Sequence, residues 1–217
     1  MKYEVDERNK VKRVPNRGHY DRETIYKILD AGTICHVSFI HNNQPFIIPT
    51  LYGRHGDRIY MHGASSSRLI KNLEKGFPVA LSVTHVDGLV LARSAFHHSM
   101  NYRSVVAFGT ARLTAEGDKT EALKVISDQV IKGRWEETRL PNQKELKATS
   151  VLEFDIEQAS AKIRTGGPSD DKPDYELDIW AGVLPINYTA GDPLEDELLK
   201  TDIPIPNSVK SYLSAFK

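Results

Sequence analysis

The sequence predicts a mainly β protein in which a small antiparallel barrel carries a few peripheral helices. Short segments rich in β-branched and aromatic residues recur along the 217-residue chain and end at glycine, asparagine or proline turns. The first of these segments are joined by connections of hairpin length, which favour antiparallel neighbours. Helical apolar periods are few and short, so the helices are expected at the rim of a closed or partly closed barrel.

The first third of the chain contains a helix signal, then strand signals, then a second helix signal. Residues 21–32 predict an amphipathic helix that Asp21 caps and Gly32 ends. Three strands are then expected, joined by the turns HNNQ and RHGD, at residues 33–40, 45–53 and 58–63. Residues 65–76 predict a helix of two to three turns, with serine caps before it and a glycine after it.

The second part of the barrel is predicted from longer strands and one clear helix. Strand-like segments lie at residues 78–86, 88–93, 102–114 and 150–164, and with the earlier ones they support a six-stranded barrel. Gly109 indicates a bulge or bend that turns a barrel corner. Residues 118–133 predict a helix that Asp118 caps, with an inward face made of Leu123, Ile126, Val130 and Ile131. In the last strand the odd positions are expected to face water, namely Val151, Glu153, Asp155 and Glu157.

Residues 21–165 are expected to form one domain with a less regular segment at each end. Residues 1–20 carry six basic and three acidic side chains without an apolar period, which indicates an arm rather than a core element. Residues 166–217 hold six of the eleven prolines and ten acidic against four basic side chains. They predict an extended acidic tail that packs on the barrel or on a partner. Within the tail, Trp180 and Val183 need a surface to pack on.

Composition excludes several classes of protein. The 29 basic and 29 acidic side chains balance, so no net field recruits nucleic acid or an anionic membrane surface. Cys35 is the only cysteine, which excludes an internal disulfide framework and is compatible with a reducing compartment. The charged start shows no signal-peptide pattern, and no apolar run approaches the length of a membrane span. We therefore expect a cytoplasmic protein that binds neither nucleic acid nor membranes.

The stretch RIYMHGASSSRLIKNL is the strongest indication of a binding site. A strand ends at His62 and Gly63, a small polar loop follows, and Ser67, Arg68 and Lys71 stand at the start of the next helix. Hydroxyl and guanidinium donors at a helix start suit a phosphate group. The same serines also serve as ordinary helix caps, with the two basic side chains solvated, so both interpretations stay open.

The chain resembles a known family at this point. The order of QPFIIPTLYG, RIYMHGASSSRLIKNL and MNYRSVVAFGTARL is similar to the FMN-binding split-barrel proteins related to pyridoxamine 5′-phosphate oxidase. It is closest to the branch of flavin-nucleotide-binding proteins that includes the nitroimidazole-resistance proteins. The resemblance covers roughly residues 20–165, and RTGGPSDD and WAGVLPI in the tail have the character of the same branch. It implies a six-stranded antiparallel split β-barrel that binds FMN.

The resemblance also implies which residues bind the flavin. The strand that contains Ile48, Pro49, Thr50, Leu51 and Tyr52 is expected to lie along the isoalloxazine ring, with backbone groups toward its pyrimidine edge. His62 and Gly63 are expected to approach the ribityl chain or the phosphate, and Ser67 and Arg68 to hold the phosphate. The family oxidase has a second basic residue directly after the arginine, whereas this chain has Leu69. Lys71 is the alternative ligand, so the exact phosphate ligands stay open.

A homodimer follows from the same resemblance. Asn101, Arg103 and Ser104 are expected to reach the flavin site of the partner subunit, with Ser104 nearest the ring. The other interpretation places Asn101 and Arg103 in solvent at a strand start. No residue is assigned a catalytic role, although Arg103, His62, His97 or His98 suits a substrate carboxylate, phosphate or nitro group. The acidic tail departs from the substrate-binding C-terminal pattern of the oxidase, so oxidation of vitamin B6 is not predicted.

Three functions stay open at the level of sequence. The first is an FMN-dependent oxidoreductase that acts on a small molecule. The second is a flavin carrier or sensor without turnover, because no dedicated acid or base is evident. The third is a haem-binding relative of the barrel, for which His97 or His98 supplies the axial ligand. No metal site is predicted, because nothing near these two histidines in the sequence supplies a third ligand.

Overall fold

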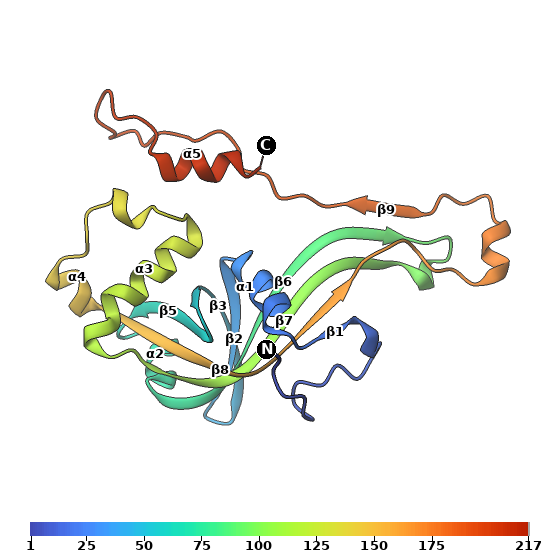
Figure 1. Ribbon diagram of the computed structural model, residues 1–217, viewed down its shortest axis with the longest axis horizontal. Coiled ribbons are helices and arrows are strands. Elements are labelled where there is room, and N and C mark those ends of the chain that lie inside the picture. Colours follow the sequence, from blue (N-terminus) through green and yellow to red (C-terminus); the bar gives the residue numbers. More distant parts are fainter. Residues whose placement is uncertain (217) are drawn as a thin grey trace.

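Nine strands form one sheet that curls into a barrel with a long extension (Figure 1). The computed structural model describes residues 1–216. Hydrogen-bonded neighbours follow the order β3-β2-β6-β7-β8-β5-β4, with β1 beside β8 and β9 beside β6, and all pairs are antiparallel. The strands are β1 (Gly18–His19), β2 (Ile34–His41), β3 (Gln44–Leu51), β4 (Gly53–His55), β5 (Arg58–Ala64), β6 (Lys75–Leu91), β7 (Ser99–Leu113), β8 (Thr149–Arg164) and β9 (Gly182–Pro185).

Six of these strands, β2, β3, β5, β6, β7 and β8, are the long ones, and β1, β4 and β9 are short additions. The predicted mainly β fold with a six-stranded barrel is therefore confirmed. The helices are α1 (Arg22–Asp30), α2 (Arg68–Leu73), α3 (Lys119–Val130), α4 (Gln143–Ala148) and α5 (Asn207–Ser214). Short 3-10 turns occur at η1 (Pro15–Arg17), η2 (Ala95–His97), η3 (Glu116–Asp118), η4 (Trp135–Glu137) and η5 (Lys172–Glu176).

The main core fills the inside of the barrel. Val37, Met61, Leu81, Ala107 and Phe154 come from five different strands, and each is at most 1% exposed. Full burial of side chains of valine or leucine size contributes about 1.5–3 kcal/mol each. Cys35 belongs to the same cluster and is fully buried. The alternation of buried and exposed residues along β2 fixes which face points inward.

Helix α1 covers one end of the barrel through one apolar face, as expected of the predicted amphipathic helix. Ile25, Ile28 and Leu29 are at most 2% exposed. The Asp21 side chain accepts a hydrogen bond from the backbone N–H of Thr24 at 2.9 Å, so the predicted cap is confirmed.

Strands β6 and β7 extend far beyond the barrel as a two-stranded arm (Figure 1). Strand β8 runs beside β7 up to Arg164, and the arm carries η2 near its tip. Gly109 produces the predicted bulge, because the β7–β8 register shifts there and a Cβ atom at this position would lie 1.8 Å from the Asp155 carbonyl oxygen. The bend lets one strand serve both the barrel and the arm.

Several predicted boundaries are wrong, each for a local reason. The segments 78–86 and 88–93 are one strand, β6, because the chain passes Asp87 as a bulge and continues. The segment 45–53 is divided at Tyr52, which is fully buried and donates a hydrogen bond from its hydroxyl group to Leu29 O. The hairpin is therefore formed by β4 and β5 instead of β3 and β5. Helix α2 has only six residues.

The expectation that the odd positions of the last strand face water is wrong for two of them. Val151 is 1% and Glu153 is 7% exposed. Val151 packs under α3 with Ala122 and Ile126 in a second small core. The Glu153 carboxylate lies 2.6 Å from Nη2 of Arg112 and 3.6 Å from Nη1 of Arg58, which compensates for its burial. The outer face of β8 is therefore covered here by α3 and by two arginines.

The first 20 residues contribute more to the core than their composition suggests. Tyr3 is 5% exposed, belongs to the main core and donates a 2.6 Å hydrogen bond to Asp57. Asn9 is 2% exposed and caps a local turn. The interpretation of residues 1–20 as an arm outside the core is therefore wrong for these two positions. The predicted limits of the three segments themselves stay a prediction.

The C-terminal segment runs back along the molecule from the tip of the arm to α3 (Figure 1). It pairs with β6 through β9, and its helix α5 is tied to η4 by hydrogen bonds from Ser208 to Glu137. The expectation that Trp180 and Val183 pack on a surface is confirmed for Val183, which is half-buried in β9, but Trp180 remains 69% exposed. Within residues 1–216 no helix has the length and apolarity needed to cross a membrane.

Candidate functional site

The loop from Ala64 to Ser67 and the start of α2 form the predicted phosphate-binding segment. Ser67 caps the helix, because its Oγ accepts the N–H of Ile70 at 3.3 Å. A Cβ atom on Gly63 would lie 3.3 Å from this Oγ, so the glycine allows a close approach of strand and loop. The Arg68 guanidinium lies over the Phe46 ring, 4.9 Å from its centroid, and makes no ion pair within the described residues. Lys71 is 4.0 Å from Glu74. Capping and anion binding are thus both compatible with these positions.

Strand β3 lies at one end of the hydrogen-bonded strand order, so one backbone edge has no strand partner. This agrees with the predicted role of its backbone in contacting a flat heterocycle. Residues alternate along it: Ile48 and Thr50 are half-buried, whereas Pro49 and Leu51 are exposed. Tyr52 follows the strand and is fully buried, so its side chain is unavailable to a ligand at the surface.

The predicted cluster at the start of β7 makes local contacts on the arm. Arg103 donates to both carboxylate oxygens of Asp87, at 2.8–3.2 Å. Asn101 donates to Gly166 O at 3.2 Å, and Ser104 donates to Lys162 O at 3.4 Å. The charge of Arg103 is therefore paired on the arm, which differs from the alternative interpretation that left it in solvent, and the predicted contact of these three residues with a flavin stays a prediction.

One chain does not bring this cluster to the phosphate-binding segment. The far end of β7 adjoins α2, where the N–H of Leu113 donates to Glu74 O at 3.5 Å. Ser104 lies nine residues before Leu113, which is about 30 Å of strand at 3.3 Å per residue. The two halves of the predicted site are thus far apart within one protomer.

A cavity of about 570 Å³ lies between α3, η4, α4 and the outer face of β5. Apolar side chains make up most of its wall, and it is lined by Leu51, Leu123, Ile126, Val130, Ile131, Trp135, Pro141 and Leu146 together with His62, Ser127, Arg134, Arg139, Glu145 and Thr149. The sequence prediction included only Leu51 and His62 among the site residues. The sequence also contained a signal for this cavity in the apolar face of residues 118–133, but the periodicity assigned that face to the core. In the structure three of those four side chains are only half-buried and face this cavity.

His62 is the one titratable cavity residue with an unmet hydrogen-bonding group. Its Nδ1 atom is buried and has no hydrogen-bond partner within residues 1–216. Burial lowers the pKa of the imidazole below its ordinary value, so the neutral ring is favoured. The two arginines of the cavity have acidic neighbours: Arg139 lies 2.7 Å from Glu145, and Arg134 lies 3.7 Å from Glu137.

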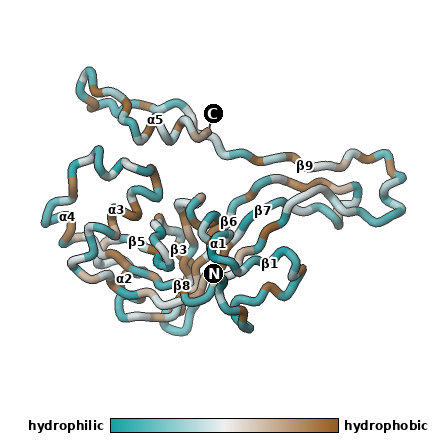
Figure 2. Tube along the Cα trace, in the orientation of Figure 1, coloured by the Kyte–Doolittle hydropathy of each residue, from teal (hydrophilic) through white to brown (hydrophobic). Residues whose placement is uncertain are grey.

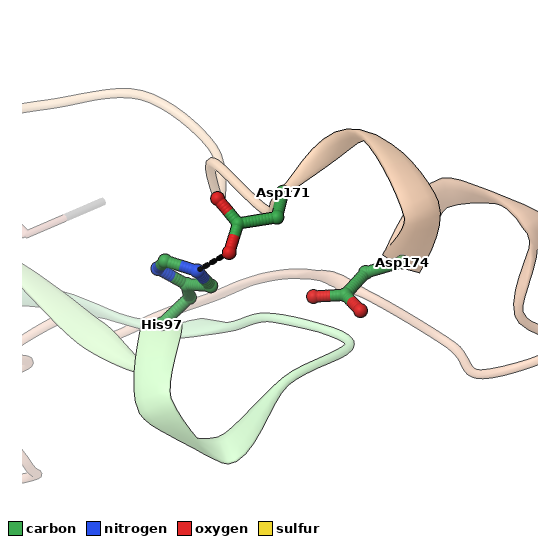
Figure 3. Close-up of side chains that lie close together, drawn as sticks. All are labelled: His97, Asp171 and Asp174. Atoms are coloured by element: carbon green, nitrogen blue, oxygen red, sulfur yellow. Dashed lines mark hydrogen bonds and ion pairs between the residues drawn. The ribbon is translucent and has the colours of Figure 1, made fainter.

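His97 lies at the tip of the arm with two carboxylates that the sequence analysis did not connect with it (Figure 3). Its Nε2 atom is 3.3 Å from Oδ2 of Asp171, and the ligand atoms of His97, Asp171 and Asp174 all lie within 4.8 Å of one another. Three such atoms, with Asp171 80% exposed, are fewer than a structural zinc site or a calcium site ordinarily takes from a protein. The prediction that there is no metal site stays a prediction.

The neighbouring His98 has a structural role at the tip. Its Nδ1 atom accepts the backbone N–H of Ala92 at 3.0 Å. The Asp170 carboxylate accepts the N–H groups of Arg93 and Ser94 at 3.0 and 3.2 Å, which fixes the start of the C-terminal segment to the arm. Both histidine rings are therefore engaged in contacts within the tip of the arm.

The barrel described above is that of a known family of proteins. Residues 21–163 match the family described as pyridoxamine 5′-phosphate oxidase, and the chain belongs to this family. The resemblance that the sequence suggested is thus confirmed, with nearly the same limits.

Solved structures place the chain more closely within the family. The flavocytochrome Anf3 from Azotobacter vinelandii is 42% identical, with 98% of this chain and 97% of that chain covered and a TM-score of 0.88. The FAD and haem binding protein from Mycobacterium smegmatis is 35% identical, with 90% and 96% covered and a TM-score of 0.87. A 5-nitroimidazole antibiotic resistance protein from Bacteroides thetaiotaomicron, at 19% identity with 67% and 86% covered and a TM-score of 0.57, shares the fold. No curated protein sequence matches the chain.

Proposed function

We propose that this protein is a flavocytochrome, an oxidoreductase that binds a flavin and a haem. The observation that carries the proposal is the presence of two separate regions suited to cofactors on one barrel. One is the phosphate-binding segment around Ser67 and Arg68, and the other is the apolar cavity that contains His62. The 42% identity to a flavocytochrome over nearly the whole of both chains supports the same function.

The phosphate-binding segment fits a flavin. Arg68 has no acidic partner within the described residues and is held over an aromatic ring, so its guanidinium is available to a phosphate. The unpaired edge of β3 adds backbone groups beside it. FMN was the sequence-based expectation, and the same residues suit the corresponding phosphate of FAD. We propose FAD, because the relative that is 35% identical over 90% of this chain is an FAD and haem binding protein.

The cavity fits a haem by its size and by the chemistry of its wall. About 570 Å³ lies within the range of pockets that enclose a small cofactor. Its wall is mostly apolar, and it offers an imidazole and two guanidinium groups. When bound, the flavin supplies two-electron exchange with a donor and the haem supplies one-electron transfer. The residues of the chain hold the two groups, orient them and exclude water.

We also propose that the protein works as a homodimer in the cytoplasm. Large apolar side chains of the arm and of the C-terminal segment have no cover within the chain: Phe96 is 88%, Trp180 69% and Tyr188 71% exposed. Figure 2 shows hydrophobic stretches along the part of the chain that runs from the arm toward α5. A second copy of the chain would cover them and bring Ser104 to the flavin of its partner. The single buried, unpaired cysteine supports a reducing compartment.

The test is the cofactor content of the purified full-length protein. We expect flavin bands and a Soret band in one absorption spectrum, FAD in the supernatant after denaturation, and a dimer by sedimentation equilibrium. FMN in the supernatant would instead support the sequence-based expectation of FMN and contradict the proposal of FAD. A protein that has flavin but does not take up added haemin would limit the proposal to a simple flavoprotein. Reduction by a nicotinamide donor followed by reoxidation would distinguish an oxidoreductase from a flavin carrier.

A further inference from the structure

We infer that His62 is the axial ligand of the haem iron and that the porphyrin occupies the cavity between β5 and α3. The inference rests on the proposed haem binding and names the residue that determines it. The contacts of the histidines within this chain distinguish the candidate ligands from one another.

His62 has the exposure and the hydrogen-bonding state that an axial ligand requires. Its side chain lines the cavity from the outer face of β5, and its Nδ1 atom is buried without a hydrogen-bond partner within residues 1–216. A buried polar nitrogen without a partner is unfavourable in a purely structural role. The other ring nitrogen, Nε2, is not enclosed and has no hydrogen bond to the described residues, so it is the atom available to iron.

The wall of the cavity is complementary to the two parts of a porphyrin. Leu123, Ile126, Val130 and Trp135 provide an apolar surface for the macrocycle. Arg134 and Arg139 stand at the rim, 40% and 69% exposed, where propionates that point toward solvent would share their guanidinium groups with the neighbouring Glu137 and Glu145. A porphyrin that enters the cavity edge first would place its apolar ring inside and its propionates at the rim.

The histidines that the sequence suggested as haem ligands have other partners. Nδ1 of His98 accepts the N–H of Ala92, and Nε2 of His97 contacts Asp171 at 3.3 Å. Both lie at the tip of the arm, at the opposite end of the molecule from α3 (Figure 1). The partly buried His85 is occupied by a 3.0 Å contact with Ile28 O. His41 and His55 also line cavities, but among the described residues His62 is the cavity-lining histidine with a buried ring nitrogen that lacks a hydrogen-bond partner.

The experiment compares haem and flavin contents of purified full-length variants after identical reconstitution with haemin. The variants are His62→Ala and His62→Met, with His97→Ala and His98→Ala as matched controls. We expect His62→Ala to lower the haem-to-protein ratio about tenfold or more while the flavin-to-protein ratio is unchanged. His62→Met should keep a haem but shift the Soret band and the ferric electron paramagnetic resonance signal, because a thioether replaces the imidazole. Both controls should match the wild type.

The other outcomes of this experiment are distinguishable from one another. Unchanged haem content and spectra in both His62 variants, with loss of haem in His97→Ala or His98→Ala, would move the ligand to the arm. Loss of flavin with retention of haem in His62→Ala would assign the cavity to the flavin. If His62→Ala loses both groups, an unshifted Soret band in His62→Met contradicts the inference and a shifted band supports it. A wild type that takes up flavin but no haem contradicts the haem part of the proposed function itself.

Discussion

Replacement of Gly53 by alanine tests how closely α3, the helix that lines the cavity, packs on the barrel. Gly53 is the first residue of β4, and a Cβ atom there would lie 2.5 Å from the Val125 carbonyl oxygen and 2.7 Å from Cα of Ile126. These are backbone atoms of a helix and cannot rotate away. Ordinary carbon contacts begin at about 3.4 Å, so α3 must retreat by about 1 Å to accept the methyl group.

The expected cost follows from two opposing effects. Overpacking of this kind costs about 1–3 kcal/mol. The backbone of Gly53 does not need a positive φ, so alanine also restricts the unfolded chain and returns about 0.4–1 kcal/mol. The net loss of unfolding free energy is about 1–2 kcal/mol, which corresponds to a decrease in Tm of about 2–8 °C for a chain of this size.

Urea unfolding of wild type and Gly53→Ala, followed by circular dichroism, measures this difference. Gly117→Ala is the matched control, because nothing lies within 4 Å of its Cβ position and its φ is not positive. The control should be neutral or slightly stabilising. A Gly53→Ala protein as stable as the control would refute the close packing of α3 on β4. Displacement of α3 should also lower haem occupancy, because the helix forms one wall of the cavity.

Three further predictions concern single side chains. Arg68→Ala should weaken flavin binding about tenfold or more through loss of a charge-assisted hydrogen bond, whereas the exposed Arg13→Ala should not, as fluorescence titration of the flavin-free protein would show. Burial lowers the pKa of His62 in the folded protein below its value of 6.5 in the unfolded chain. As the pH falls, the unfolded chain therefore takes up the proton before the folded protein does. The stability associated with neutral His62 is present above the unfolded pKa of 6.5 and is lost as the pH falls below it. Urea unfolding of the haem-free protein at about pH 7.5 and about pH 5.5 should therefore show a larger loss for wild type than for His62→Leu, and equal losses would contradict the assigned burial. Burial raises the pKa of Cys35 to about 12, so iodoacetamide should label it in urea but about 100-fold more slowly in the folded protein, and rapid native labelling would show that the core opens.

Local signals in the sequence were sufficient for the elements whose partners lie nearby in the chain. Asp21 caps α1, and Gly109 forms a bulge, because each position expresses a conformational preference of its own residue type. The strand pattern of β2 was equally direct, since alternate residues face a core and solvent. These features depend on periods of a few residues, which a single sequence displays.

The errors concern contacts made across the sheet or with a covering helix. Val151 and Glu153 were expected in water, because the sequence does not show that α3 and two arginines cover that face. The division of 45–53 at Tyr52 depends on a contact with Leu29, 23 residues away. The cavity was missed for the same reason: the apolar face of α3 is identical in pattern whether it meets packed side chains or a space.

The geometry of β5 relates the two proposed sites to each other. Successive residues of a strand face opposite sides, so His62 faces the cavity beneath α3 while Gly63 faces the Ser67 hydroxyl of the phosphate-binding segment. Their Cα atoms are about 3.8 Å apart. A flavin held through Ser67 and Arg68 and a haem held through His62 would therefore be attached to adjacent residues of one strand, with no mobile segment between them. A His62 substitution that removes haem should for this reason leave flavin binding intact and interrupt only the passage of electrons from one group to the other.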